Sequence, residues 1–167
     1  MKNLVLLFVL IFSVSCAQDE KQIIDETPFQ KKINAEYKDA TKSPLKEKDL
    51  KAFKGLDFFT HDSAFMVTAK LKRTPDSEWF NMKTTKARVS KERVYGVLSF
   101  ELKGKSFQLN VYQGEELMQT AGYTDYLFLP FLDNTNGSTS YSGGRYMDLR
   151  IPDGDTIQVD FNSAYNP

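Results

Sequence analysis

The chain has 167 residues, of which 41% are hydrophobic and 26% are charged, a composition typical of one globular domain and not of a disordered protein. Its 22 basic and 22 acidic residues balance, so there is no electrostatic reason to expect nucleic acid as a partner. Aromatic residues make up 13% of the chain, which favours β-structure, and a single cysteine excludes an internal disulfide.

The first residues have the pattern of an export signal. Lys2 gives a short positive segment, and residues 4–12 form an apolar run that is too short to span a bilayer as a stable helix. Cys16 follows, an order that resembles a bacterial lipobox, in which the cysteine is acylated and becomes the new N-terminus. We therefore expect a signal peptide over residues 1–15, a lipid on Cys16 and a polar tether over residues 16–26. An ordinary secretory signal is the alternative.

Two short helices are expected at the start of a single domain over residues 27–167. A capping box at residues 27–30, with proline in the first helical position, begins a helix that we expect to run to about Ala40. Residues 43–44 are a serine and a proline, which predict the start of a second helix, and Gly55 is its expected stop.

From residue 65 onward, apolar residues alternate with polar ones, which predicts β-strands. The expected strands cover residues 65–72, 79–85, 94–102, 107–111, 126–131, 146–151 and 156–161. Turn residues predict one hairpin at Lys103-Gly104 and another at residues 152–155. The pattern indicates a mainly β (α+β) fold, with an antiparallel sheet closed or folded over as a barrel or sandwich and preceded by the two helices.

The long segment 133–144 has no periodic pattern, and loops of this length in compact domains are often functional. Two glycines at its end allow the backbone to approach a ligand, and Arg145 can bind a carboxylate or a phosphate through two donors. The alternative is a turn that enters a strand, with Arg145 in a salt bridge to Asp133 or Asp160. The residues considered for ligand binding are Asp133, Tyr141, Gly143, Gly144, Arg145, Tyr146, Asp160 and Asn162.

Tyrosine is frequent in the C-terminal part of the chain, at positions 123, 126, 141, 146 and 165. A tyrosine combines an apolar ring with a hydroxyl group, which suits the recognition of a sugar or a peptide. It suits packing within a sheet equally well, and the sequence leaves both interpretations open.

Catalytic and metal-binding patterns are weak. His61 is the only histidine, which excludes a site with several histidine ligands, and the Asp133 segment fails the spacing of a calcium loop. A Ser-His-Asp triad with Ser138, Ser140 or Ser142 is formally possible, but no Gly-x-Ser-x-Gly motif is present. We therefore expect no metal and no cofactor, and we favour a protein that is not an enzyme.

Two C-terminal motifs resemble a known family. The first comprises Phe131, Asp133, Thr135, Gly137, Tyr141 and Gly143 to Tyr146, and the second comprises Asp160 to Asn162 with Ala164 to Pro167. Together with Phe53, Gly55-Leu56 and Phe58-Phe59, they resemble the bacterial domain-of-unknown-function family 1684 over about residues 29–167. The resemblance implies a fold context and no established activity. Family members usually continue past the equivalent of Pro167 with a segment that holds cysteines and prolines, so we expect either a member that lacks this segment or a sequence that is truncated at its C-terminus.

These patterns favour a binding module held in the membrane by its lipid, on the periplasmic or surface side of the cell envelope. Its ligand would be a small molecule, a glycan or an envelope protein. A structural or assembly lipoprotein is one alternative, and a hydrolase acting on envelope material, with His61 or a carboxylate pair as its base, is another.

Overall fold

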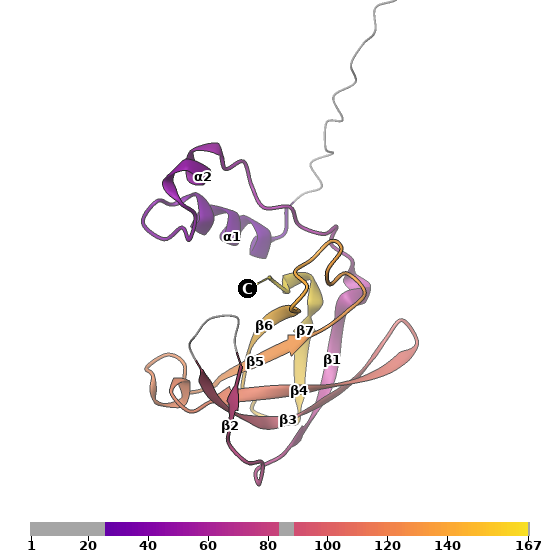
Figure 1. The fold of residues 1–167 in the computed structure, drawn as a ribbon. Helices are drawn as coiled ribbons and strands as arrows, with labels where there is room; N and C mark the ends of the chain where they lie inside the picture. The colour runs from indigo at the N-terminus through magenta and orange to yellow at the C-terminus, as the bar shows by residue number, and fades with distance from the viewer. Residues whose placement is uncertain (1–25, 84–88, 167) are drawn as a thin grey trace, which may run out of the picture.

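The computed structural model describes residues 26–83 and 89–166, so the expected signal peptide and Cys16 lie outside the described residues. Within these ranges, seven strands form one antiparallel sheet that curls into a half-barrel (Figure 1). The strands are β1 (Met66–Arg73), β2 (Phe80–Met82), β3 (Ser90–Leu102), β4 (Lys105–Gly114), β5 (Tyr126–Phe131), β6 (Arg145–Arg150) and β7 (Thr156–Asp160). They are ordered β6-β5-β4-β3-β1-β7, and β2 also pairs with β3. The prediction of a mainly β antiparallel fold is thus confirmed, with a half-barrel as its form.

The helices are α1 (Pro28–Lys38) and α2 (Glu47–Ala52), with short 3-10 helices η1 (Ser63–Phe65), η2 (Leu117–Gln119) and η3 (Phe161–Ser163). Figure 1 shows α1 and α2 together beyond one end of the sheet. No helix in the described part of the chain has the length and apolar character needed to cross a membrane.

The start of α1 is the capping box that the sequence predicts. The Thr27 hydroxyl accepts a hydrogen bond from the Gln30 backbone at 3.2 Å, and the Gln30 side chain accepts one from the Thr27 backbone at 3.0 Å. The predicted start of the second helix is wrong, because the Ser43 hydroxyl accepts a hydrogen bond from the Leu45 backbone in a turn. As a result α2 begins only at Glu47.

The hairpin predicted at Lys103-Gly104 is confirmed. Both residues have positive φ, 50° and 73°, as a two-residue turn of the type that matches strand twist requires. The pairing of β3 with β4 then runs without interruption from Leu102 opposite Lys105 back to Gly96 opposite Val111.

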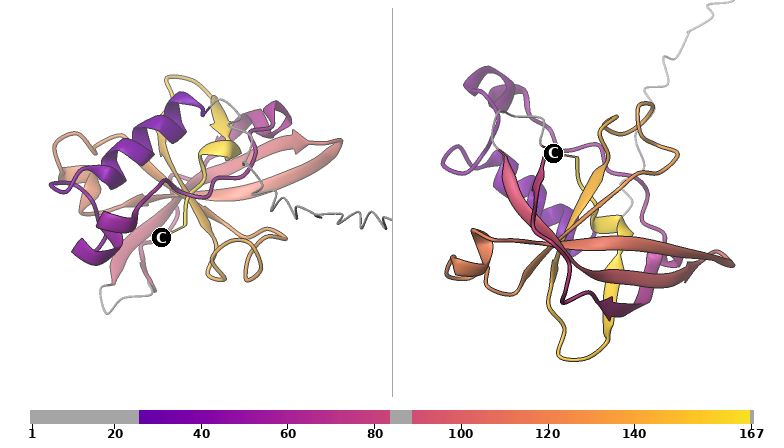
Figure 2. Two further views of the ribbon diagram at one scale, coloured as in Figure 1. Left: turned by 90° about the horizontal axis from the view of Figure 1, so that it is seen from above. Right: turned by 60° about the horizontal axis from the view of Figure 1, so that its bottom comes forward.

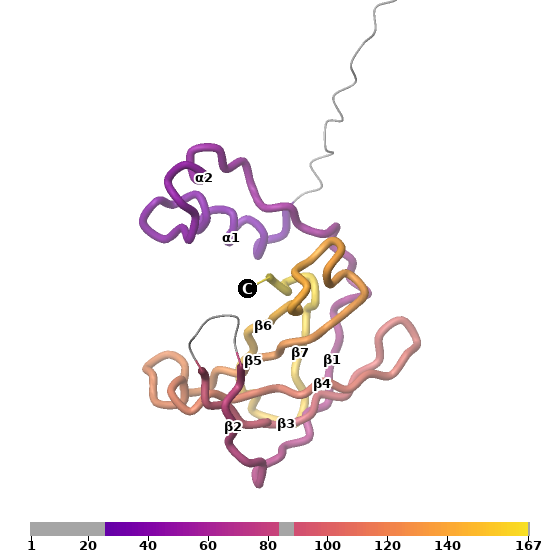
Figure 3. Tube along the Cα trace, in the orientation of Figure 1, coloured from indigo at the N-terminus to yellow at the C-terminus, as the bar shows by residue number. Residues whose placement is uncertain are grey.

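The second predicted hairpin is wrong. β7 pairs with β1, from Met66 opposite Asp160 to Lys70 opposite Thr156, while β6 pairs with β5. The turn after β6 therefore carries the chain from one edge of the sheet to the other, and Figure 3 shows β7 beside β1. The curl nevertheless brings the two edges close, since Tyr146 and Tyr165 exchange two backbone hydrogen bonds of 2.9 and 3.0 Å. Figure 2 shows the curled sheet from two further sides.

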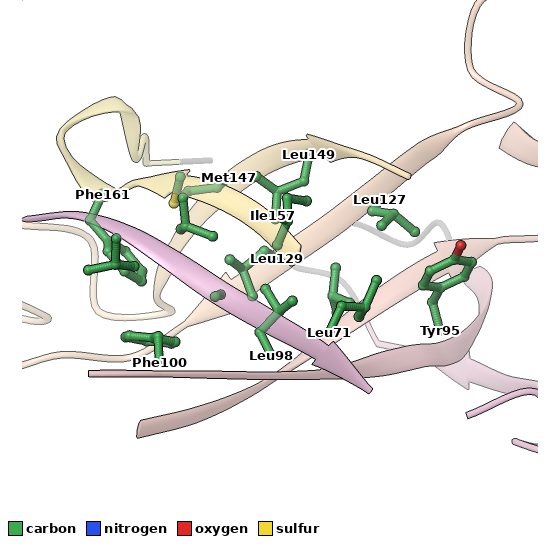
Figure 4. Close-up of a cluster of buried hydrophobic side chains, with 14 residues drawn as sticks. Leu71, Tyr95, Leu98, Phe100, Leu127, Leu129, Met147, Leu149, Ile157 and Phe161 are labelled. Carbon is green, nitrogen blue, oxygen red and sulfur yellow. The ribbon is translucent and has the colours of Figure 1, made fainter. Parts of the chain in front are cut away.

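The inner face of the curl holds the hydrophobic core (Figure 4). Its buried members are Val67, Ala69, Leu71, Tyr95, Leu98, Phe100, Val111, Leu127, Leu129, Met147, Leu149, Ile157, Val159 and Phe161. The alternation along β5 and β6 places leucine and methionine inside and aromatic or charged side chains outside. The outer face of these two strands therefore presents aromatic and charged side chains.

Candidate functional site

Asp133 and Arg145 form an ion pair that joins the two ends of the long loop. The Arg145 Nε donates to the Asp133 Oδ2 at 3.0 Å, and one Nη donates to the same oxygen. The guanidinium also lies 5.4 Å from the ring centroid of Phe59 and 5.2 Å from that of Phe131. Only 14% of the Arg145 side chain is exposed. In this geometry Arg145 forms a salt bridge to Asp133, which is the alternative to ligand binding that the sequence analysis gave for it.

Hydrogen bonds inside the loop hold its backbone in place. The Asp133 Oδ1 accepts from the Thr135 backbone at 2.8 Å and from the Thr135 hydroxyl. The Asn136 side chain donates to the Tyr141 carbonyl at 2.9 Å. Burial disfavours the charged form of Asp133, but the hydrogen bonds from Thr135 and Arg145 outweigh it, so the pKa of Asp133 lies below its ordinary value.

The two glycines at the end of the loop fit against their own chain. Gly144 has a φ of 115°, and a Cβ there would lie 3.0 Å from the Phe131 carbonyl oxygen. A Cβ on Gly143 would overlap the ring of Tyr141. The close packing of the loop on itself therefore explains why both positions are glycine, and no ligand is needed to explain them.

Asp160 and Asn162 belong to a different group of contacts. The Asn162 Nδ2 donates to the Asp62 carbonyl at 3.0 Å, and its Oδ1 accepts from the Asp62 backbone at 2.9 Å. The Asp160 side chain accepts from the Asn162 backbone at 3.0 Å. A hollow of about 250 Å³ lies here, lined by Thr27, Pro28, Phe29, His61, Met66, Asp160, Asn162 and Ser163. Asn162 thus ties the end of β7 to the segment before β1.

His61 does not form part of a Ser-His-Asp triad among the described residues. Its side chain lines the hollow, and in residues 26–83 and 89–166 no hydrogen bond joins it to a serine hydroxyl. The Ser140 hydroxyl is engaged with Thr135 at 2.7 Å. Over the same residues, no three histidine, cysteine, aspartate or glutamate side chains are grouped so as to hold a metal ion.

A second cluster lies on the outer face of β5 and β6. We call it the tyrosine face, and it comprises Tyr126, Phe128, Tyr146, Asp148 and Tyr165. The hydroxyls of Tyr126 and Tyr165 donate to the same Asp148 oxygen, Oδ1, at 2.8 and 2.7 Å. The Tyr146 ring packs edge-on against Phe128, with centroids 5.0 Å apart, and against Tyr165, with centroids 6.2 Å apart.

The electrostatics of the tyrosine face centre on Asp148. Burial raises the pKa of Tyr126 and of Tyr165, and their hydrogen bonds to Asp148 raise both further. The two phenols therefore stay protonated at neutral pH and remain donors. Asp148 is exposed, and within the described ranges no lysine or arginine forms an ion pair with it, whereas Asp125, just before β5, pairs with Arg150 at 2.7 Å.

The structure brings the predicted site residues together only in part. Asp133, Gly143 and Gly144 lie in one loop, and Arg145 is the first residue of β6 directly after it. The Tyr141 backbone of the same loop donates to the Asn166 side chain at 3.1 Å. Tyr146 belongs instead to the tyrosine face. Asp148 was not predicted as a site residue, although it stands two residues after Tyr146 in a strand of period two and opposite Phe128.

Comparison with known proteins supports the fold and the family. A solution NMR structure of an uncharacterized protein of Haloarcula marismortui is similar, with 32% sequence identity and a TM-score of 0.61. The match covers 83% of this chain and 74% of that one. No curated protein matches the chain. The model of a family described as a protein of unknown function, DUF1684, matches residues 51–167, and the chain therefore belongs to that family.

Proposed function

We propose that this protein is an exported lipoprotein whose domain binds a small molecule, a glycan or a peptide segment of an envelope protein, without catalysing a reaction. The observation that carries the proposal is Asp148, an exposed carboxylate that accepts hydrogen bonds from two phenols among aromatic rings and, within residues 26–83 and 89–166, forms no ion pair with a lysine or arginine. Rings with hydroxyl groups offer apolar contact and hydrogen bonds together, which is the chemistry of recognition surfaces.

The position of the tyrosine face also suits binding. Its side chains stand on two paired strands, whose inner faces are packed in the core through Leu127, Leu129 and Met147. A site on strands is held more firmly than one on a loop, so less conformational entropy is lost when a ligand binds. The face is therefore preorganised by the fold.

Replacement of Tyr146 tests the site. Thermal unfolding of the purified full-length protein would be followed against neutral oligosaccharides, short peptides and small amines. A ligand at 100 times its Kd adds about 2.7 kcal/mol, which is a shift of ~2–4 °C per kcal/mol for a domain of this size. Because Tyr146 contacts both Phe128 and Tyr165, we expect Tyr146→Ala to weaken binding at least tenfold.

Tyr37→Ala is the matched control, because Tyr37 lies in α1 and its ring faces Phe53 at 6.1 Å. It should leave the ligand-induced shift unchanged. A panel without effect on the unchanged protein, or an equal shift in Tyr146→Ala, would contradict a binding role for this face.

The export proposal rests on the N-terminal sequence, and Cys16 tests it. Acyl chains on the cysteine contribute about 0.8 kcal/mol per buried CH₂ group, so a protein with several chains stays in the membrane. We expect Cys16→Ala to move the protein from the membrane fraction to the soluble fraction on cell fractionation. Continued recovery of the variant with the membranes would show that another feature anchors it.

A further inference from the structure

Two arginines at one end of the half-barrel have no acidic partner. Arg73 is the last residue of β1, and Arg93 lies near the start of β3. Among the residues that the structure describes, neither guanidinium forms an ion pair, whereas the neighbouring Lys91 pairs with Glu115 at 2.7 Å. The turn that follows Arg73 lies at the opposite end of the molecule from α1 and α2 (Figure 1). Two positive charges are therefore left uncompensated in this region.

Both arginines lie on the inner face of the curl, beside the hydrophobic core. Alternation along β1 places Arg73 on the same side as Leu71, which is a buried member of the core. Arg93 is opposite Gln113, which follows the buried Val111 by two residues along β4. The two side chains therefore extend the inner face of the sheet beyond its apolar part.

Tyr95 is a neighbour of both arginines. The Arg73 guanidinium lies 3.6 Å from the centroid of the Tyr95 ring, and Arg93 is two residues before Tyr95 in the same strand. The chain after Arg73 is held against this strand, since the Thr74 hydroxyl donates to the Val94 carbonyl at 2.6 Å and the Thr74 backbone donates to the Tyr95 carbonyl at 3.1 Å. Figure 4 shows Tyr95 at the end of the core cluster. Burial raises the pKa of Tyr95, and the charges of both arginines oppose that rise, in agreement with this arrangement.

Contacts with aromatic rings leave most of the N–H donors of these arginines unused. The Arg93 guanidinium lies 5.0 Å from the centroid of the Trp79 ring, and its Nε and Nη2 donate to the Gln113 Oε1 at 3.2 and 2.7 Å. Within the described part of the chain, the Nη1 of Arg93 and all the side-chain nitrogens of Arg73 have no hydrogen-bond partner. A guanidinium stacks on a ring through its plane and donates hydrogen bonds through its edge. Arg73 is exposed, so a ligand can reach its donors from solvent.

We infer that Arg73 and Arg93 together bind a phosphate group, either free or as the monoester of a small molecule. This site is separate from the tyrosine face, which lies on the outer face of the sheet. A phosphate monoester carries a charge of about −1.5 to −2 at neutral pH and has three acceptor oxygens, which matches two uncompensated guanidinium groups with free edges. A carboxylate carries one charge and would leave one arginine uncompensated. In residues 26–83 and 89–166, the acidic residues of the adjoining turn, Asp76 and Glu78, form no ion pair with either arginine.

Calorimetric titration of the purified full-length protein in a phosphate-free buffer tests this inference. The probes are inorganic phosphate, phenyl phosphate and benzoate, at an ionic strength held constant with sodium chloride. We expect saturable binding of the phosphate probes to the unchanged protein, and binding at least tenfold weaker in Arg73→Gln and in Arg93→Gln, because each substitution removes one charge and its edge donors. Benzoate, which has the same ring as phenyl phosphate, should bind at least tenfold more weakly than phenyl phosphate. Tighter binding of phenyl phosphate than of inorganic phosphate identifies a monoester as the source, and equal binding identifies the free anion.

Lys72→Gln is the matched control. Lys72 precedes Arg73 in β1, but alternation places it on the outer face of the sheet, opposite Val97. The substitution removes one positive charge from an exposed side chain and should leave the affinity for phosphate unchanged. Arg73 is also exposed, so Arg73→Gln should fold even if Arg93→Gln, which releases the buried Gln113, does not. Thermal unfolding of each variant checks that it is folded.

Absence of saturable binding by both phosphate probes, or unchanged affinity in a folded Arg73→Gln, would overturn the inference. An equal loss of affinity in Lys72→Gln and Arg73→Gln would also overturn it, because the effect would then be a general attraction between charges and not a site. Benzoate that binds as tightly as phenyl phosphate would show that the ligand is not a phosphate.

Discussion

Leu98→Ala is expected to lower the free energy of unfolding by about 2–5 kcal/mol, the largest loss we predict for a single substitution. Leu98 has no exposed surface and lies at the centre of the inner face of the sheet (Figure 4). It is opposite Leu71 on β1 and Leu109 on β4, so the sheet cannot collapse around the missing side chain without disturbing both pairings. Urea denaturation followed by circular dichroism measures the difference.

Leu132→Ala is the control for this measurement, since Leu132 is 73% exposed. It removes the same atoms from a side chain that is largely in water, and we expect a change within about 0.5 kcal/mol. A loss below 1 kcal/mol in Leu98→Ala would mean that the inner face is not the packed core of the protein.

The second large effect is expected at Asp133. Asp133→Ala would leave the Arg145 guanidinium, 14% exposed, between two aromatic rings without its carboxylate. Removal of one member of a fully buried pair costs about 3–5 kcal/mol. Because Asp133 is itself 27% exposed, we expect Asp133→Ala to lower the free energy of unfolding by about 2–3 kcal/mol. Asp125→Ala breaks the pair with Arg150, in which both side chains are about half exposed, and should cost at most about 1 kcal/mol.

The pH dependence of the Asp133 effect has a definite sign. The pKa of Asp133 is lower in the folded protein than the value of about 3.9 in an unfolded chain. As the pH falls, the unfolded chain therefore binds the proton first. The stabilisation by ionised Asp133 is fully present above the unfolded pKa and is lost as the pH falls through the lower pKa of the folded protein. The difference in the free energy of unfolding between the unchanged protein and Asp133→Ala should be constant near pH 7 and shrink below about pH 4. A difference that does not change down to pH 2 would exclude the ion pair as its origin.

Local signals in the sequence predicted the elements well. Lys103-Gly104 meets the conformational demand of a two-residue hairpin turn by itself, and the Thr27–Gln30 capping box needs only four consecutive residues. A period-two pattern likewise predicted a strand over residues 146–151, and β6 covers Arg145–Arg150. Each of these features depends on neighbours in the chain, which a sequence displays directly.

Features that depend on distant residues were missed. The turn residues Pro152 to Asp155 allow the chain to reverse its direction, but they do not determine which strand pairs with β7. The curl of the whole sheet determines that partner, which is β1. Glu92 stands between Lys91 and Arg93, in a run that is typical of a solvated strand. Glu92 is nevertheless only 5% exposed, and its cross-strand partners are Phe80 and Gly114, which lie 12 and 22 residues away in the chain. The Asp133–Arg145 pair was anticipated as an alternative because two opposite charges flank one loop.

The bridge between Tyr146 and Tyr165 has a consequence for behaviour at high concentration. An edge strand such as β6 presents unpaired N–H and C=O groups, and these can template pairing with another molecule. At Tyr146 both groups are taken by Tyr165, so the segment after η3 covers the edge at the point where the strand begins. Residues 164–166 thus cover this edge at the start of β6, and we expect a proteolytic cut after Ser163 to expose it to pairing with another molecule.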